Sequence, residues 1–328
     1  MTKRLAEVAK KAGVSEATVS RVLNGRSGVS EATRASVLTA LDVLGYERPT
    51  KLRGERGRLV GLVLPELQNP IFPALAEVVT ASLAQRGFTP LLAARTIGGV
   101  PERDYIEMLL DHQVSGVVFA GGSYALAEAE HGHYRALTDR RMPVVMVNAG
   151  VADLGFPHIS TDDAVAVEQA YGHLRSLGHE RVGMVMGPED HVPSRRKLAA
   201  LEGKEFLVER TNFSMESARL AAAKLIERGV TGMICASDVL ALGSIRAARR
   251  LGLDVPSDIS VVGFDDSALM TCTDPPLTTV RQPIEMMGQA AVDLLVNQIE
   301  GSGVEPDELL FEPELVVRGS TAPAPQRG

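Results

Sequence analysis

A turn and a short helix are predicted by Gly13-Val14-Ser15-Glu16-Ala17-Thr18-Val19-Ser20-Arg21-Val22-Leu23-Asn24. Ser15 stands where an N-cap belongs, because its hydroxyl oxygen can accept a hydrogen bond from an early backbone N–H of the helix. Val19, Val22 and Leu23 follow the i, i+3, i+4 spacing, which predicts one buried face. The opposite, less bulky face consists of Glu16, Ala17, Ser20 and Arg21.

Another helix is predicted just upstream, because Leu5, Val8, Ala9 and Ala12 repeat at helical spacing. Helix, glycine turn and helix in succession are typical of a helix-turn-helix. In that motif the second helix lies in the major groove of DNA with its N-terminal residues on base edges. The alternative is a small helical hairpin at the edge of a core, in which Arg21 would be a solvated surface charge.

A third helix and a linker complete the predicted N-terminal domain. Ser30 can cap the helix and Gly45 supplies its C-terminal stop. Residues 46–58 are polar and basic, and Pro49, Gly54 and Gly57 interrupt any regular element there. We therefore expect a DNA-binding domain over residues 1–46, a hinge or linker over 47–58, and an effector-binding and dimerisation domain over 59–328. The apolar positions of the third helix are Ala32, Val37, Leu38, Leu41 and Leu44.

Charge is divided unevenly along the 328 residues. Residues 1–58 hold 12 Lys and Arg against 6 Asp and Glu, whereas the rest of the chain holds 22 against 35. A polyanion should therefore meet the N-terminal domain, where basic side chains displace counterions. Cys235 and Cys272 lie among apolar or small residues and are expected to be reduced core thiols. No signal peptide or long apolar run is evident, so we expect a cytoplasmic protein without a membrane span.

From Leu59 onward, β-branched runs alternate with amphipathic segments, which predicts parallel α/β lobes. In the first lobe we expect strands at 59–64, 91–94, 116–119 and 144–147, with helices at 74–86 and 102–112. In the second we expect strands at 182–186, 206–208, 232–236 and 259–264, with helices at 194–201, 214–228 and 239–251. A strand at 277–280, a helix at 285–300 and strands near 309–311 and 315–317 follow. The helix near 194–201 is predicted to be short.

Polar residues follow many of these strands. In open parallel sheets ligands bind beyond the carboxyl ends of the strands, so two facing lobes would bring these residues together. Carboxylates and amides can hydrogen-bond vicinal hydroxyls, and an aromatic face can cover a sugar ring. Asp238 has an alternative role as a helix N-cap, and Asp265 and Asp266 could form a turn. The residues after the strands include Pro65-Glu66-Leu67-Gln68-Asn69-Pro70, Phe72, Gly121-Gly122-Ser123, Asn148, Gly187-Pro188, Ser237-Asp238 and Phe264-Asp265-Asp266.

Two short segments carry a family resemblance that spans nearly the whole chain. Ser20-Arg21-Val22-Leu23-Asn24-Gly25 and Val29-Ser30-Glu31-Ala32-Thr33-Arg34 closely resemble the N-terminal signature of the lactose-repressor (LacI/GalR) family of bacterial transcription regulators. The resemblance implies an all-α helix-turn-helix head plus a two-lobed, periplasmic-binding-protein-like α/β domain of type I. It implies lobe 1 at about 59–156 and 283–311, and lobe 2 at about 157–282 and 312–320.

The resemblance also implies function: an effector-responsive DNA-binding regulator, a repressor of sugar-utilisation genes, acting as a homodimer on double-stranded operator DNA without cofactor or metal. The implied DNA contacts are Arg4, Ser15, Glu16, Ala17, Thr18, Ser20, Arg21, Asn24, Ser30, Thr33 and, through the minor groove, Leu52. The implied effector contacts are Phe72, Asn148, Arg196, Lys197, Ser237, Asp238, Phe264 and Asp265. The sequences of residues 46–49, 65–72 and 313–319 further resemble those of the actinobacterial maltose-type regulators. This resemblance implies a maltose-like sugar or a related metabolite as effector.

Two alternative functions are an enzyme and a secreted sugar-binding protein. Asp265 and Asp266 could serve an enzyme as acid and base or hold a metal, but no nucleophile elbow, phosphate loop or metal spacing accompanies them. The His131-Gly132-His133 motif has no evident partner ligands. A secreted sugar-binding protein would share the lobes but not the helix-turn-helix.

Helices over 73–83 and 286–295 each carry an apolar stripe, which could form a dimer surface or, equally, pack in the core. The Pro/Ala-rich residues 319–328 are expected to be disordered.

Overall fold

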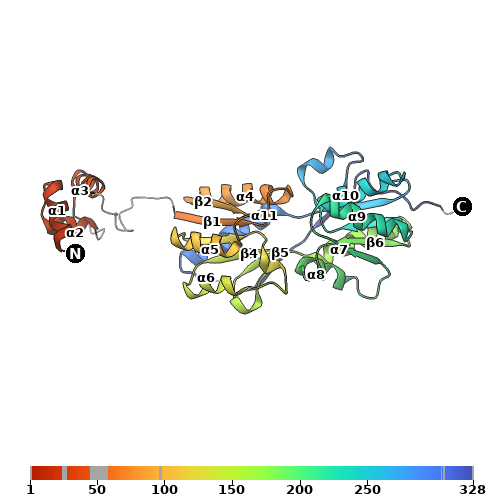
Figure 1. Cartoon of the computed structure of the whole chain (residues 1–328), viewed down its shortest axis with the longest axis horizontal. Coiled ribbons are helices and arrows are strands. Elements are labelled where there is room, and N and C mark those ends of the chain that lie inside the picture. Colours follow the sequence, from red (N-terminus) through yellow and green to blue (C-terminus); the bar gives the residue numbers. More distant parts are fainter. Residues whose placement is uncertain are drawn as a thin grey trace. The chain divides into compact units, whose positions relative to one another are not determined.

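The computed structural model describes residues 2–23, 28–44, 58–95, 98–303, 305 and 307–326 (Figure 1). The chain divides into two compact units, Met1–Arg58 and Leu59–Gly328, and the division coincides with the end of the predicted linker. Within the described residues no helix is long and apolar enough to cross a lipid bilayer.

The N-terminal unit contains the three predicted helices, α1 (Thr2–Ala12), α2 (Glu16–Leu23) and α3 (Glu31–Val43). Their core gathers Val8 from α1, Val19 and Val22 from α2, and Val37 from α3. Of the apolar positions named for the third helix, Ala32 is exposed, whereas Ala40, which is not one of them, is buried. Ala32 precedes Val37 by five residues, so at 3.6 residues per turn it points away from the core.

Lobe 1 is built on a six-stranded sheet in the order β11-β5-β4-β3-β1-β2. Successive strand residues face opposite sides, so Leu62 packs with residues of α4 and α11, while Val63 packs with residues of α5 and α6. These two pairs of helices cover opposite faces of the sheet (Figure 1). Gly288 allows α11 to approach α4 closely, since a Cβ there would lie 2.7 Å from Val78 Cγ1. The elements are β1 (Arg58–Leu64), α4 (Ile71–Gln85), β2 (Phe88–Ala94), α5 (Glu102–Asp111), β3 (Gly116–Phe119), α6 (Arg135–Asp139), β4 (Val144–Val147), β5 (His158–Thr161), α11 (Ile284–Ile299) and β11 (Glu308–Phe311).

Lobe 2 repeats the plan with a sheet in the order β12-β10-β9-β8-β6-β7. Its β12 runs antiparallel to β10, whereas β6 to β10 pair in parallel. As predicted, α8 is short, with 9 residues against 15 in α4 of lobe 1. The elements are α7 (Asp163–Ser176), β6 (Val182–Met186), α8 (Val192–Ala200), β7 (Leu207–Arg210), α9 (Met215–Glu227), β8 (Gly232–Cys235), α10 (Asp238–Arg250), β9 (Ser260–Asp265), β10 (Thr278–Arg281) and β12 (Glu314–Val316).

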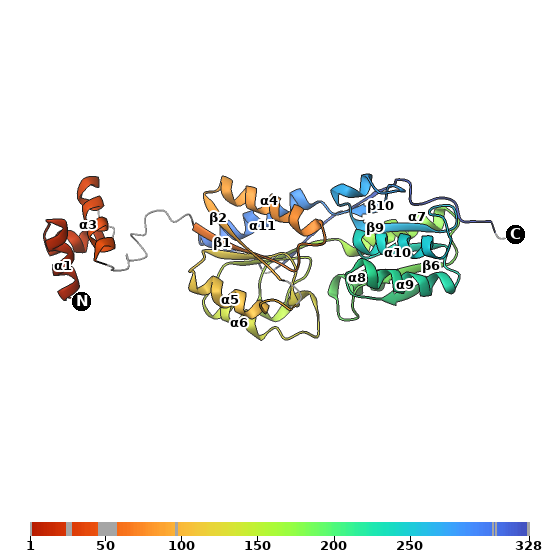
Figure 2. The same cartoon turned by 45° about the horizontal axis from the view of Figure 1, so that its top comes forward.

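The sequence analysis did not predict three elements, β5, α6 and α7. The strand His158–Thr161 contains only one aliphatic residue, Ile159, and buries the polar Ser160 and Thr161 instead, so it lacks the expected apolar pattern. Because β5 pairs with β4 and β11, lobe 1 continues past the predicted limit of about residue 156. The chain then crosses between the lobes three times, after β5, after β10 and after β11 (Figure 2).

Two predictions about side chains and the C-terminus are wrong. Cys272 is exposed, whereas Cys235 is buried as expected. Residues 319–326, predicted to be disordered, are held along lobe 2: Ser320 is fully buried, its Oγ donates to Val261 O at 2.6 Å, and Ala324 N donates to Leu177 O at 2.8 Å. Composition did not reveal these bonds, because they use the backbone of Ala324 and the side chain of Ser320, for which the C-cap residue of α7 and strand β9 of lobe 2 supply the partners.

Candidate functional sites

The polar face of α2 is exposed, as the sequence predicts. Ser15 caps the helix, its Oγ accepting from Thr18 N at 3.1 Å, and Ser30 caps α3 in the same way through Thr33 N at 3.2 Å. Glu16, Ala17 and Arg21 are exposed, while the two valines beneath them are fully buried. The first turn of α2 is therefore capped and exposed to solvent. Asn24, Leu52 and the side chain of Arg4 lie outside the described part of the chain.

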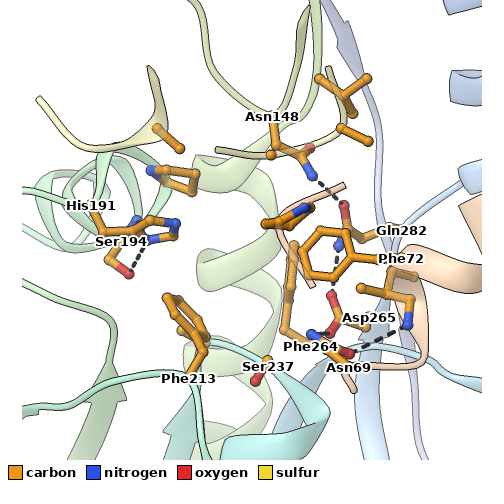
Figure 3. Close-up of a pocket in the computed structure, with 18 of the residues that line it drawn as sticks. Asn69, Phe72, Asn148, His191, Ser194, Phe213, Ser237, Phe264, Asp265 and Gln282 are labelled. Carbon is orange, nitrogen blue, oxygen red and sulfur yellow. Dashed lines mark hydrogen bonds between the residues drawn. The ribbon is translucent and has the colours of Figure 1, made fainter. Parts of the chain in front are cut away.

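A cavity of about 290 Å³ opens between the two lobes of the second unit, at the carboxyl ends of the strands (Figure 3). Its walls come from both lobes and from the crossing segment after β10. Most residues expected to bind an effector do line it: Phe72, Asn148, Lys197, Ser237, Phe264 and Asp265.

Asp265 lies at the polar end of the cavity, buried at the end of β9 (Figure 3). Its backbone φ of +122° takes it out of the strand conformation. Oδ1 accepts from Gln282 Nε2 at 2.6 Å and Oδ2 accepts from Asn69 Nδ2 at 3.3 Å. Burial, followed by the charge of Asp238, raises the pKa of the Asp265 carboxyl well above its usual range. The carboxyl thus links the crossing segment, lobe 1 and lobe 2.

Gln282 is fixed by a further set of hydrogen bonds. Its Oε1 accepts from Thr161 Oγ1 at 2.8 Å and from Asn148 Nδ2 at 3.5 Å. Because the oxygen faces those donors, the amide nitrogen must face Asp265. This arrangement orders the polar end of the cavity before any ligand enters.

A buried ion pair forms another wall. Lys197 Nζ donates to Asp163 Oδ1, and the two side chains are only 5% and 6% exposed. The ammonium also lies 3.9 Å from the centre of the Phe264 ring. Burial raises the pKa of the Asp163 carboxyl although Lys197 acts to lower it. The lysine charge is therefore already matched by a carboxylate and an aromatic face.

His191, Ser194 and Phe213 form the lobe 2 wall opposite (Figure 3). His191 caps α8, its Nδ1 accepting from Ser194 N at 3.3 Å, and its ring meets that of Phe213 edge to face at 4.9 Å. Burial, and then Lys197, lower the pKa of His191 to about 3, so the ring is neutral at physiological pH.

Two residues assigned to the effector, Arg196 and Asp238, do not line the cavity. Arg196 forms a two-pronged ion pair with Glu308 of β11, at 2.6 and 3.2 Å, and so joins lobe 2 to lobe 1. Asp238 is fully buried: its Oδ2 accepts from Ser267 N at 2.8 Å and its Oδ1 from Thr279 Oγ1 at 2.6 Å. The N-cap of α10 is Ser237, not Asp238. Successive residues of a helix differ by about 100° in direction, so of the neighbours Arg196 and Lys197 only Lys197 points into the cavity.

Several lining residues were missed for identifiable reasons. Asp163 follows β5, a strand that the apolar pattern did not reveal. Gln282 directly follows β10, and the strand-end rule applied there would have found it. His191 is the N-cap of α8, and Phe213 lies in the loop between β7 and α9. Neither position belongs to a periodic apolar pattern that would point to a cavity wall.

The chain is similar to known regulators over its whole length. Residues 4–49 match the family described as bacterial regulatory proteins, lacI family, and residues 171–321 match a periplasmic binding protein-like domain. The HTH-type transcriptional regulator MalR of Streptomyces coelicolor is 51% identical, across 100% of this chain and 99% of MalR. The chain belongs to the lacI family. The HTH-type transcriptional repressor CytR of Escherichia coli is 31% identical, across 97% of each chain.

Solved structures of family members agree with the fold. The regulator CelR in complex with cellobiose has 32% identity and a TM-score of 0.70, covering 96% of this chain and 99% of CelR. The lac repressor dimer bound to operator and an anti-inducer has 29% identity and a TM-score of 0.72, covering 96% and 98%. As a lacI-family member this protein is a transcriptional regulator and not an enzyme. The acid and base roles considered for Asp265 and Asp266 are therefore set aside. Instead, Asp266 accepts from Arg281 Nε at 2.7 Å and pairs with Arg318 at 2.6 Å.

Proposed function

We propose that this regulator is a cytoplasmic repressor of sugar-utilisation genes whose operator binding is modulated by a small uncharged sugar in the interlobe cavity. The proposal rests on one observation: the cavity has the hydrogen-bonded group of Asp265, Asn69 and Gln282 at one end and phenylalanine rings along its walls. Carboxylates and amides match vicinal hydroxyls, and the ring faces match the apolar side of a pyranose. The relative CelR was solved with cellobiose.

The charges of the cavity favour an uncharged sugar over a phosphorylated one. Lys197 is the only lysine or arginine among the described lining residues, and Asp163 already neutralises it. The N-terminus of α7 is satisfied by Asp162, whose Oδ1 accepts from Ala164 N at 3.0 Å and Val165 N at 3.1 Å. Among the described lining residues, neither Lys197 nor the N-terminus of α7 thus offers a phosphate an unmatched positive charge. A maltose-like sugar fits this chemistry.

A screen with named probes tests the effector. Maltose, cellobiose and glucose 6-phosphate would each be added while thermal unfolding is followed, since a ligand at 100 times its Kd stabilises the native state by about 2.7 kcal/mol. A neutral sugar should raise the unfolding temperature and the phosphate should not. Stabilisation by glucose 6-phosphate alone would contradict the uncharged class, and no stabilisation by any of the three probes would contradict a maltose-like effector.

Asp265→Asn locates the effector. Asn69 and Gln282 both present amide nitrogens to Asp265, and their oxygens are held by Ile71 N at 3.3 Å and by Thr161. An asparagine at 265 would therefore set its single NH2 group against one of these two donors. We expect operator binding to persist while effector affinity falls at least tenfold. Asp139→Asn, at an exposed position of α6, is the matched control and should behave as the wild type. An unchanged response in Asp265→Asn would place the effector elsewhere.

The proposed DNA contacts come from the exposed face of α2, with Arg21 on a base or phosphate and Glu16 and Ala17 tuning sequence choice. One short recognition helix reads few base pairs, so we propose a homodimer on a near-palindromic operator whose half-sites are about one helical turn apart. Effector binding would change the separation of the two heads through residues 47–58. A structure of the lac repressor shows that family member as a dimer on its operator.

Exposed apolar side chains in lobe 2 support the dimer. Leu220, Leu251 and Leu269 are 54%, 48% and 62% exposed. The stripes first considered, on α4 and α11, instead pack mainly on each other and on the sheet, although Met286 is 56% exposed. Sedimentation at micromolar concentration should show a dimer that Leu269→Asp dissociates. A monomeric wild type with one chain per operator would exclude this arrangement.

A further inference from the structure

Lobe 1 holds a buried carboxylate that does not line the cavity. Glu102, the first residue of α5, has a side chain that is 5% exposed. Its Oε2 accepts from Ser123 N at 3.1 Å, and its Oε1 accepts from Ser123 Oγ at 3.2 Å and from the hydroxyl of Tyr134. Arg95 Nη1 lies 3.4 Å from Oε2. A buried carboxylate with this many donors is expected to hold the segment that supplies them.

That segment is residues 120–127, here called the cleft loop. Gly121 and Gly122 have φ of +130° and +159°, and a Cβ on Gly122 would lie 2.6 Å from Glu102 Oε2. The backbone thus lies directly on the carboxylate. Tyr134 adds to the anchor, because its hydroxyl accepts from Tyr124 N at 3.3 Å and lies 3.1 Å from Ser123 Oγ.

The two histidines of the His131-Gly132-His133 motif also bind the cleft loop. His131 Nε2 lies 3.1 Å from Ser123 O and 3.0 Å from Leu126 O, so a proton on that nitrogen serves both carbonyls. His133 Nε2 lies 3.3 Å from Ser123 Oγ and 3.5 Å from Glu102 Oε1. The two histidines therefore help to hold the cleft loop through these contacts.

The opposite side of the cleft loop faces the effector cavity and lobe 2. Ala120, Gly121, Gly122, Ala125 and Leu126 all line the cavity. Leu126 pairs with His191 of lobe 2 in an isolated antiparallel bridge, and Ala127 N donates to Asp190 O at 2.8 Å. One side of the loop is thus fixed by Glu102 and its partners, while the other forms a cavity wall and a backbone contact between the lobes.

We propose that Glu102 is a positioning residue for the effector site, which fixes the cleft loop from behind and thereby sets effector affinity and the contact with lobe 2. The proposal rests on the proposed function in so far as the effector binds in the cavity. Glu102 itself touches no effector. Its action is to keep Ser123 and the two glycines in the one conformation that both forms the wall and presents Ala127 N to lobe 2.

Tyr134→Phe is the first test, with Tyr105→Phe as the matched control. Tyr134 is fully buried, so the change removes one hydroxyl from the anchor without altering the ring. Tyr105, on α5, donates instead to Ala94 O at 3.0 Å, away from the cleft loop. Amide hydrogen exchange in the free protein should be at least tenfold faster at Ser123 and Ala127 in Tyr134→Phe and unchanged in Tyr105→Phe. Affinity for the sugar that stabilises the wild type should fall at least tenfold, with operator affinity retained.

Glu102→Gln gives a second, pH-resolved reading. Burial raises the pKa of Glu102, but hydrogen bonds from His133, Tyr134 and Ser123 N, with the charge of Arg95, outweigh it and lower the pKa from its ordinary value. Protection of the cleft loop, corrected for intrinsic exchange, should therefore persist through the pH range in which an ordinary glutamate takes up its proton and be lost only at lower pH. In Glu102→Gln this titration should be absent, because no carboxyl remains.

Three results would overturn the positioning role. These are unchanged exchange at Ser123 and Ala127 in Tyr134→Phe, faster exchange there with unchanged sugar affinity, and faster exchange spread equally over β1 and β3, which would indicate general destabilisation. If the wild type binds no sugar, the proposed function fails, and the positioning role then stands or falls on the exchange data alone.

Discussion

Lys197→Met tests whether the buried ion pair in the cavity wall holds lobe 2 together. The substitution keeps most of the side-chain volume and removes the ammonium, leaving Asp163 buried without its partner. Removing one partner of a buried pair costs about 3–5 kcal/mol, and the lost contact with the Phe264 ring, 3.9 Å away, adds about 0.5–2 kcal/mol. Proton uptake limits the total, because burial already raises the pKa of Asp163. We expect a loss of about 3–5 kcal/mol in the free energy of unfolding at pH 7.

Urea unfolding of four proteins decides the matter. Lys224→Met is the matched control, since Lys224 is 65% exposed and its pair with Glu209, at 3.5 Å, should be worth less than about 1 kcal/mol. Lys197→Met combined with Asp163→Asn should recover much of the loss, because no unpaired charge remains. The cost of Lys197→Met should also shrink as pH falls and Asp163 takes up a proton. If Lys197→Met costs no more than Lys224→Met, or if the double variant is no more stable than the single one, the reasoning is refuted.

Three further predictions address the DNA-binding helix, a buried acid and the C-terminal segment. Arg21→Ala should weaken operator binding and lower its discrimination by about 1–3 kcal/mol in gel-shift titrations; unchanged affinity and specificity would remove Arg21 from the interface. Burial is the main cause that raises the pKa of Asp238 from 3.8 to about 6, so the folded protein loses stability as the pH rises from 4 through 6 and this carboxyl gives up its proton. The free energy of unfolding of Asp238→Asn, relative to that of the wild type, should therefore increase by up to about 3 kcal/mol between pH 4 and pH 7. A difference that does not vary with pH would contradict this. Ser320 Oγ donates to Val261 O at 2.6 Å and accepts from Thr278 N at 2.8 Å, so Ser320→Ala should cost about 1–3 kcal/mol in chemical unfolding; a neutral effect would show that residues 319–326 do not stabilise lobe 2.

The amino-acid sequence determined the local elements and the chemistry at their ends. The spacing of Val19 and Val22, with Ser15 as cap, suffices for the recognition helix because burial of one helical face is a local pattern. Apolar runs likewise located β1, β3, β4 and β6, and strand ends then pointed to Asn148 and Asp265. Residues that follow buried strands reach one edge of a sheet whatever the detailed packing.

Only the tertiary structure decided which polar side chains meet and which segments become ordered. β5 is a strand because β4 and β11 pair with its backbone on both sides, a fact that its own side chains do not encode. Lys197 pairs with Asp163, 34 residues away, and Arg196 pairs with Glu308, 112 residues away. Because Arg196 and Lys197 are neighbours in α8 and both are basic, the sequence alone could not tell which of them faces the cavity. Residues 319–326 are ordered because Val261 and Leu177 offer them backbone partners. The periodicity of a helix or strand depends on residues that are close in the sequence. Ion pairs, cavity walls and hydrogen bonds between segments depend on residues far apart in the sequence, which only packing brings together.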